Sequence, residues 1–445
     1  MLSGCDIVII SSIEWDFNWQ GHQEIAKRFA SAGNRILYIE NLGVRSPGLN
    51  DARRVFSRVS NWAQALPNGI REVSTNLFVY SPLMLPPFGS KARQLVNRRV
   101  LLKLISRTVK KLNFKSEIIW TYLPTDTVVS LIKVLRKPES VVVYYCIADF
   151  TGLTPHAGAI LDSELTVIEM SDVVFAQCQA LAERWPESRH EVGIFPFGVN
   201  LDLFSPDDVR LLNNHSRNHF AENIDPDFMS RLPRPVIGYV GGVHKHFDAG
   251  LLIAMAKARP DWSWVLIGPL QVPPNYLARM SNVHLLGAKA HEDLPRYIRG
   301  FDVGIVPYVS NEYTMTVIPT KINEYLAMGK PVVSTDLREV IAFNDKHNVI
   351  ITTPNRPAEF LSSIEKALHS TKEAHIVHRR KVAALSGWKD RLEQMSDTIE
   401  RELNHKFAEK SAEDERVGLT VSENERARDR CGAAIRAGGG GSGAE

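Results

Sequence analysis

Short apolar and β-branched runs alternate with segments of helical periodicity along most of this chain. In the first half, runs of this kind cover residues 6–12, 34–40, 117–122, 140–149 and 172–178. Strands that are almost continuously apolar, with helices between them, are typical of parallel sheets that are covered on both faces. The pattern therefore predicts an α/β domain in the first half.

A second series of the same kind follows the proline-rich segment 232–235. Its runs cover residues 235–240, 263–268, 283–287, 302–307, 331–335 and 348–353. The intervening stretch, 205–234, is polar and irregular, as a domain boundary is expected to be. We expect two parallel-sheet domains of the Rossmann-like type, residues 1–210 and 211–385, with a hinge near residue 210.

The end of the chain has a different composition. From Leu403 onward it is rich in charge and poor in aromatic residues, and residues 438–443 read Gly-Gly-Gly-Gly-Ser-Gly. Such segments bury too little apolar surface to offset the entropy of ordering. The sequence predicts a disordered tail over residues 403–445.

Composition narrows the class of protein. The 445 residues are 44% apolar and 23% charged with a net charge of +3, which is typical of a soluble globular protein and gives no sign of a nucleic-acid partner. The four cysteines, Cys5, Cys146, Cys178 and Cys431, are widely spaced, so neither a disulfide framework nor a zinc site is expected. Without a signal-peptide pattern or a membrane-spanning apolar run, a cytoplasmic location is expected.

Residues 90–115 stand out because basic and apolar positions interleave. Nine lysines and arginines alternate there with leucine, valine and isoleucine, which predicts a basic amphipathic helix. Two interpretations remain open: a packed helix whose cationic face is solvated, or a surface that contacts anionic lipid.

In open α/β sheets, ligands bind beyond the carboxyl ends of the strands. The segment 317–333 reads as a helix that begins near Pro319 and Thr320, ends at Gly329 and leads into a buried strand. Its amino end and Lys321 are suited to a phosphate, and Glu324, one turn on, to ribose hydroxyls. The alternative is an ordinary surface pair of Lys321 and Glu324.

The pattern Pro-x-Lys-x-x-Glu-Tyr-Leu-Ala-Met-Gly-Lys-Pro-Val-Val at 319–333 resembles the nucleotide-binding helix of the group 1, family 4-like glycosyltransferases, in particular the branch that builds bacterial envelope polysaccharides. Gly-Tyr-Val-Gly-Gly at 238–242 and Phe-Asp-Val-Gly-Ile-Val-Pro-Tyr at 301–308 follow the family's order. The resemblance is strong over 235–335 and looser in the first half.

This resemblance implies a GT-B fold, a nucleotide-sugar donor, UDP- or GDP-linked, in the second domain, and a saccharide or lipid-linked acceptor in the first. It further implies that residues 386–402 form a helix crossing back to the first domain. No metal and no other cofactor is expected. A lipid-linked acceptor would place the protein at the inner face of the cell membrane, in peripheral contact with anionic lipid.

One position departs from the family pattern, which has two glutamates eight positions apart. Counting back from Glu324 gives Thr316, and the nearest upstream carboxylate is Glu312. In the family the first glutamate is associated with the transferred sugar. The donor sugar, and whether its anomeric configuration is retained or inverted, therefore stay open.

Three further loops carry candidate residues. At 241–248, Gly242 permits close backbone approach, and Lys245 and His244 are candidates for the diphosphate, although tight turns use the same glycines. At 11–24, Trp15 and Trp19 are candidate acceptor platforms, or simply close a core, while Asp16 and His22 are candidates for proton transfer.

The fourth loop follows the strand at 140–149 and places Asp149 at its carboxyl end. Attack by an acceptor hydroxyl requires removal of its proton, which a carboxylate can accept. Asp149 is the first candidate for the base, and capping of the next segment is the alternative interpretation.

Other classes of protein are weighed against this one. The segment after the first strand lacks GxGxxG, so a dinucleotide-dependent oxidoreductase is rejected, and no pyridoxal-lysine motif favours a phosphorylase. An epimerase of the same fold, or a non-catalytic nucleotide-sugar-binding or scaffold protein, remains an alternative. The Asp-x-Asp at Asp225 and Asp227 lies between the domains and is not expected to hold a metal.

Overall fold

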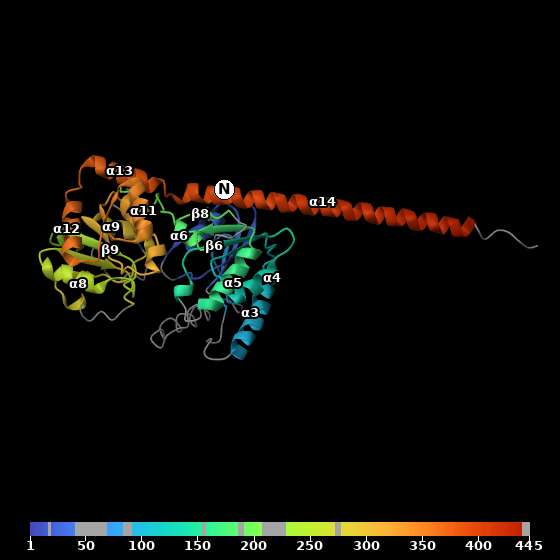
Figure 1. Ribbon diagram of the computed structural model, residues 1–445, viewed down its shortest axis with the longest axis horizontal. Coiled ribbons are helices and arrows are strands. Elements are labelled where there is room, and N and C mark those ends of the chain that lie inside the picture. Colours follow the sequence, from blue (N-terminus) through green and yellow to red (C-terminus); the bar gives the residue numbers. More distant parts are fainter. Residues whose placement is uncertain are drawn as a thin grey trace, which may run out of the picture.

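The computed structural model describes residues 1–16, 19–40, 69–82, 91–153, 157–185, 191–206, 228–271 and 277–437, with side chains except at 91–97, 153 and 413–437. The described residues form two α/β domains, each built on its own sheet, and one long helix that runs from the second domain along the first (Figure 1).

The first domain contains an eight-stranded sheet in the order β3-β4-β2-β1-β5-β6-β7-β8. Every neighbouring pair is parallel except β3 with β4. The strands are β1 (Asp6–Ile10), β2 (Arg35–Ile39), β3 (Ile70–Ser74), β4 (Leu77–Tyr80), β5 (Ile118–Thr121), β6 (Val141–Cys146), β7 (Val173–Ala176) and β8 (Gly193–Ile194).

Both faces of this sheet are covered. Successive residues of a strand point to opposite faces, so each strand contributes to two cores. Val8 and Ile10 of β1 join one core, with α3 (Lys91–Lys111), α4 (Asp126–Leu135) and α5 (Ala157–Met170). Ile7 and Ile9 join the other, with α1 (Gly21–Ser31) and α14 (Trp388–Ala437). This arrangement explains why the sequence shows continuous rather than alternating apolar runs.

The second domain contains a six-stranded, all-parallel sheet in the order β11-β10-β9-β12-β13-β14. Its strands are β9 (Val236–Val240), β10 (Ser263–Ile267), β11 (Val283–Leu285), β12 (Val303–Val306), β13 (Val332–Thr335) and β14 (Ile350–Thr353). The helices are α8 (Ala249–Ala258), α9 (Leu294–Arg299), α10 (Lys321–Ala327), α11 (Arg338–His347), α12 (Pro357–Leu368) and α13 (Glu373–Ala384).

The strand and fold-class predictions are confirmed. Each of the eleven runs expected from the sequence contains a strand of the two sheets. The sequence did not indicate the antiparallel β3–β4 pair or the two-residue β8. The basic segment is helical, as expected, over α3.

The chain passes between the domains twice, and the two passages lie side by side. Val199 N donates to Ser386 O at 2.8 Å, and Trp388 N donates to Val199 O at 3.2 Å. Val199 and Phe204 already pack in the core of the second domain. The first passage therefore lies near Val199, before the boundary expected at residue 210.

Helix α14 begins at the second passage and packs on the first domain. Trp388, Leu392, Met395, Ile399 and Leu403 are buried in the core that contains β1. Over residues 403–437 the expected disorder is corrected by the structure, in which the helix continues to Ala437 and extends past the domain (Figure 1). Residues 438–445 of the expected tail lie outside the described residues. Alanine, glutamate, lysine and arginine, which are frequent there, favour helix even without a packed face.

Within the described residues, no helix is both long enough and apolar enough to cross a membrane.

Candidate functional site

Two loops meet at the carboxyl ends of the adjacent strands β9 and β10. Gly241 has φ +133° and Gly268 has φ +148°, both in the region that favours glycine. A Cβ on Gly268 would lie 2.1 Å from Gly241 O, so the two backbones approach too closely for any side chain. The two glycines therefore lie at the strand ends, the place beyond which ligands bind in open α/β sheets.

Lys321 lies beside this glycine loop and is only 8% exposed. Its Nζ donates to Tyr308 Oη at 2.6 Å and lies 5.0 Å and 4.8 Å from the ring centroids of Tyr239 and Tyr308. A Cβ on Gly241 would lie 3.2 Å from Nζ. No carboxylate of the described chain forms an ion pair with Lys321, so its charge is held by π faces, a phenol and the adjacent loop.

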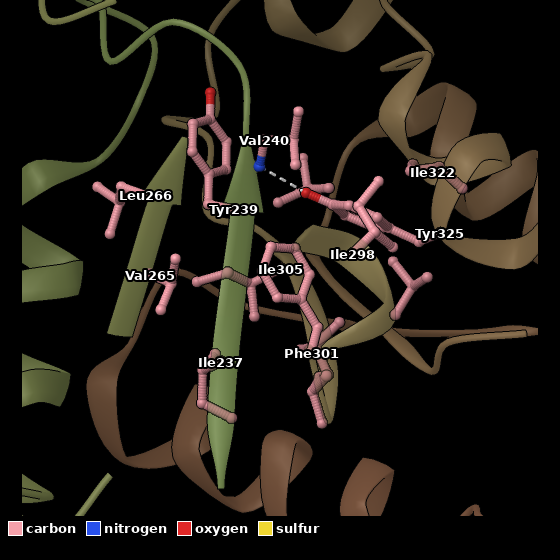
Figure 2. Close-up of a cluster of buried hydrophobic side chains, with 14 of the residues drawn as sticks. Ile237, Tyr239, Val240, Val265, Leu266, Ile298, Phe301, Ile305, Ile322 and Tyr325 are labelled. Atoms are coloured by element: carbon pink, nitrogen blue, oxygen red, sulfur yellow. Dashed lines mark hydrogen bonds between the residues drawn. The ribbon is translucent and has the colours of Figure 1, made fainter. Parts of the chain in front are cut away.

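Tyr325 fixes helix α10, which carries Lys321, against the sheet. Gly304 on β12 has no Cβ, and one placed there would lie 2.4 Å from the ring of Tyr325. The ring can therefore cross β12, where its hydroxyl accepts a hydrogen bond from Val240 N at 2.7 Å (Figure 2). Lys321 is thereby held at the end of β9.

Glu324 projects from the same helix toward the junction of the two domains. Its Oε1 lies 3.3 Å from Nε2 of His291, and the two side chains are 13% and 16% exposed. The ring of His291 is stacked with Trp19 of the first domain, with centroids 6.1 Å apart and planes 23° apart. Glu324 and Trp19 are therefore linked through one imidazole.

The loop at 241–248 is joined to the loop that follows β12. His246 stacks on Tyr313 with centroids 4.5 Å apart, and Phe247 pairs with Tyr308. Gly242 is buried with its carbonyl accepting from Tyr239 Oη at 2.9 Å, and His244 Nδ1 accepts from His246 N at 3.1 Å. Lys245 is exposed. Of these candidates, Gly242 shapes the loop, while Lys245 has its ammonium in solvent.

Pro319 and Thr320 precede α10, and their carbonyls accept from Ile322 N at 3.0 Å and Asn323 N at 3.1 Å. The helix spans seven residues, and Thr320 is its N-cap residue. Phosphate binding at its amino end stays a prediction.

Thr316 lies at the end of the 3-10 turn Thr314–Thr316. It occupies the position of the family's first glutamate, eight residues before Glu324. Its carbonyl accepts from Cys178 Sγ of the first domain at 3.1 Å. Next to it, Ala180 N donates to Glu339 at 3.2 Å, and Arg338 pairs with Glu183 at 2.7 Å. Position 316 is therefore part of the contact between the domains.

In the first domain, Trp15 packs its ring edge against Tyr38, with centroids 5.1 Å apart, and partly closes the core below α1. Asp16 is half-exposed and forms a short ion pair with Arg71 of β3. Trp15 thus has the core-closing role that was the alternative interpretation, and Asp16 lies at the surface next to it.

His22 is fully buried, and this environment argues against the expected proton-transfer role. Its ring lies 4.2 Å from that of Tyr122, and Nε2 is 2.9 Å from Ser12 Oγ. Burial lowers the pKa of His22 to about 3, so the imidazole is neutral at any physiological pH. The sequence placed His22 correctly at the start of α1 but did not reveal that it faces the sheet.

Asp149 lies beyond the carboxyl end of β6, where it makes the capping contact of the alternative interpretation and an ion pair with Arg184. Its Oδ1 accepts from Thr151 N at 2.9 Å and so caps the following turn, and it also lies 3.3 Å from Arg184 Nη2. Arg184 Nη2 donates to Glu164 at 2.9 Å as well. Burial raises the pKa of Glu164 above its usual value, and the nearby Arg184 guanidinium only partly offsets this rise. Sequence reasoning missed Glu164 and Arg184.

In the described ranges, no group of three His, Cys, Asp or Glu side chains is placed to hold a metal ion. Asp225 and Asp227 lie outside the described residues.

Residues 234–370 match the family model described as Glycosyl transferases group 1. This segment contains all six strands of the second sheet together with Gly241, Lys321 and Glu324. The second domain is a group 1 glycosyltransferase domain. The resemblance noted in the sequence is confirmed for this domain, and the first domain lies outside the matched residues.

The chain is also similar to TuaH of Bacillus subtilis (strain 168), whose name refers to a putative glycosyltransferase of teichuronic acid biosynthesis. The identity is 26% over 238 residues. The match spans 52% of this chain and 57% of TuaH, so the chain covers a little over half the length of this curated relative.

Solved structures align over nearly the whole chain. Sucrose-phosphate synthase from Thermosynechococcus elongatus has a TM-score of 0.64 at 16% identity and covers 89% of this chain and 99% of its own. HepE of Anabaena in complex with UDP has a TM-score of 0.60 at 14% identity, with coverages of 89% and 100%. WaaG, a glycosyltransferase involved in lipopolysaccharide biosynthesis, has a TM-score of 0.58 at 12% identity, with coverages of 88% and 99%. These likenesses show the fold, and the GT-B architecture expected from the sequence is confirmed.

Proposed function

We propose that this protein transfers a sugar from a nucleoside diphosphate donor, UDP- or GDP-linked, to a saccharide or lipid-linked acceptor in polysaccharide or glycoconjugate synthesis. The observation that carries the proposal is the Lys321 ammonium, held against the main chain of Gly241 at the end of β9. It lies in a domain that matches the group 1 glycosyltransferases.

A buried ammonium without a carboxylate partner is costly unless a ligand supplies negative charge. A diphosphate beyond β9 would meet Lys321 and the glycine-rich main chain together, with Lys245 able to reach it from the surface. Glu324, one turn along α10, is the acceptor for ribose hydroxyls. That HepE was solved with UDP supports a uridine nucleotide as the first donor to test.

Envelope polysaccharide synthesis is the setting we propose, because the names of both TuaH and WaaG refer to the synthesis of envelope glycans. In this setting the acceptor binds at the first domain, and Asp149 removes the proton of its hydroxyl as the bond to the sugar forms. Asp149 Oδ1 is already held by Thr151 and Arg184, which fixes the orientation of the carboxylate.

We further propose that no metal is needed, since Lys321 and Lys245 can neutralise the developing diphosphate. Transfer that persists unchanged after treatment with EDTA would support this proposal. Loss of transfer in EDTA, with recovery on adding magnesium or manganese, would refute it.

Peripheral contact with an anionic membrane also belongs to the proposal. Residues of α3 on the side away from the core are exposed: Arg99, Lys103, Arg107, Lys110 and Lys111. Leu101, Ile105 and Val109 on the opposite side are buried. Each basic residue near an anionic surface contributes about 1 kcal/mol, so several acting together suffice for reversible attachment at the cytoplasmic face.

One observation favours a second candidate, a protein that binds the nucleotide sugar without transferring it. Thr316 occupies the position of the family's first glutamate, and its carbonyl is bonded to Cys178 across the domain contact. Calorimetry with UDP and GDP, combined with an assay of sugar transfer, separates the two candidates. Binding without transfer to any acceptor would favour the second, and absence of nucleotide binding would refute both.

A further inference from the structure

The ring of His291 is the point at which three separate parts of the chain meet. Trp19 of the first domain is stacked on it, and Phe204 of the first inter-domain passage meets it edge-on, with centroids 5.2 Å apart. Glu324 Oε1 of α10 accepts a hydrogen bond from Nε2 at 3.3 Å. His291 thus contacts the first domain, the passage and the proposed ribose-binding carboxylate at once.

Trp19 is itself held in a fixed orientation. Its Nε1 donates to Oε2 of Glu24 at 2.9 Å. Oε1 of the same buried carboxylate accepts from Arg28 at 2.7 Å and from Asn200 Nδ2 at 3.2 Å. Because Asn200 belongs to the inter-domain passage, the position of the Trp19 ring depends on how the passage lies on the first domain.

A carboxylate with one oxygen bonded to a fixed imidazole has its plane, and therefore its remaining lone pairs, fixed as well. We propose that His291 is a positioning residue for Glu324, and that Trp19 keeps His291 in place. This inference rests on the proposed function, in which Glu324 binds the donor's ribose. The first domain then completes the nucleotide site of the second without touching the nucleotide.

A reciprocal effect follows from thermodynamic linkage. If contact between Trp19 and His291 strengthens nucleotide binding, nucleotide binding strengthens the contact between the domains by the same factor. Aromatic stacking contributes about 0.5–1.5 kcal/mol, which corresponds to about two- to tenfold in dissociation constant. The expected effect of losing the stack is a change of that size in nucleotide affinity.

The test is calorimetric titration of the full chain with UDP and with GDP, without acceptor. Trp19→Leu keeps an apolar side chain but removes the ring, and His291→Ala removes the link to Glu324. Each is expected to raise the dissociation constant about two- to tenfold. The double variant is expected to bind no more weakly than the weaker single variant, because both changes break one chain of contacts.

Trp19→Phe is the rescue variant, since it retains a ring that can stack on His291; affinity close to wild type is expected. His347→Ala is the matched control. His347 also contacts an aromatic ring, that of Phe343 at 4.8 Å, but lies at the far end of α11. The His347→Ala variant is expected to bind UDP and GDP with the affinity of the wild type. Thermal melting of every variant shows that the fold is retained.

The outcomes separate this inference from the proposed function. If Glu324→Ala weakens nucleotide binding while Trp19→Leu and His291→Ala bind as the wild type does, the positioning role is refuted and the proposed function stands. If the two single effects add fully in the double variant, the shared chain of contacts is refuted. If UDP and GDP do not bind the wild type, the proposed function fails first.

Discussion

Replacement of Lys321 by methionine tests the proposed diphosphate site directly. Methionine keeps most of the length of the side chain between Tyr239 and Tyr308 but removes the charge and the hydrogen bond to Tyr308 Oη. In the proposed site the ammonium also donates a hydrogen bond to the diphosphate, and a hydrogen bond between charged groups contributes about 1.5–3 kcal/mol to nucleotide binding. At about 1.4 kcal/mol per tenfold, the dissociation constant for UDP or GDP is expected to rise about 10- to 150-fold.

Stability is expected to change little in this variant. The loss of the Tyr308 hydrogen bond, which the charged ammonium donates and which contributes about 1.5–3 kcal/mol, is offset by removal of a buried charge. Lys330→Met is the matched control, because Lys330 is also largely buried and its Nζ donates to Arg299 O at 2.7 Å. Calorimetry should show weak binding for Lys321→Met and wild-type affinity for Lys330→Met. Equal affinity of Lys321→Met and the wild type would refute the site.

Three further predictions concern other parts of the protein. Asp149→Asn is expected to leave UDP affinity unchanged but to lower the rate of transfer at least about 100-fold; near-normal turnover would move the role to Asp16. Gly241→Ala places a side chain on a backbone with φ +133°, where its Cβ would lie 3.0 Å from Lys321 Cε. The free energy of unfolding, measured by urea titration, should fall by about 1–3 kcal/mol. Unchanged stability would contradict the loop geometry. Replacing four basic residues of α3 by glutamine, namely Arg98, Arg99, Lys103 and Arg107, should abolish salt-sensitive co-sedimentation with anionic liposomes. Sedimentation of this variant equal to that of the wild type would refute membrane contact.

The strands could be predicted because a strand buried on both faces must be apolar at nearly every position. Where that condition fails, prediction failed too. The edge strand β3 carries Arg71 and Glu72 and has no fully buried residue, so it does not resemble a buried parallel strand. Helix α14 beyond Leu403 was missed because its charged composition, read alone, does not distinguish a helix from a disordered chain.

The candidate site was predictable only where it lies within one continuous segment. Lys321 and Glu324 share a turn of α10, so their proximity on one helix follows from spacing alone. The contacts of Glu324 with His291, and of His291 with Trp19, join residues of two domains that no local pattern relates. The burial of His22 depends likewise on which face of α1 meets the sheet.

The most direct test of the central claim is a transfer assay with a panel of UDP- and GDP-sugars and lipid-linked saccharides extracted from bacterial membranes. Release of the nucleoside diphosphate and glycosylation of the acceptor are measured together for the wild type and Lys321→Met. We predict that the wild type transfers sugar from at least one donor, with equal amounts of nucleotide and product, and that Lys321→Met requires far more donor. No transfer from any donor by a wild type that binds UDP or GDP would contradict the account.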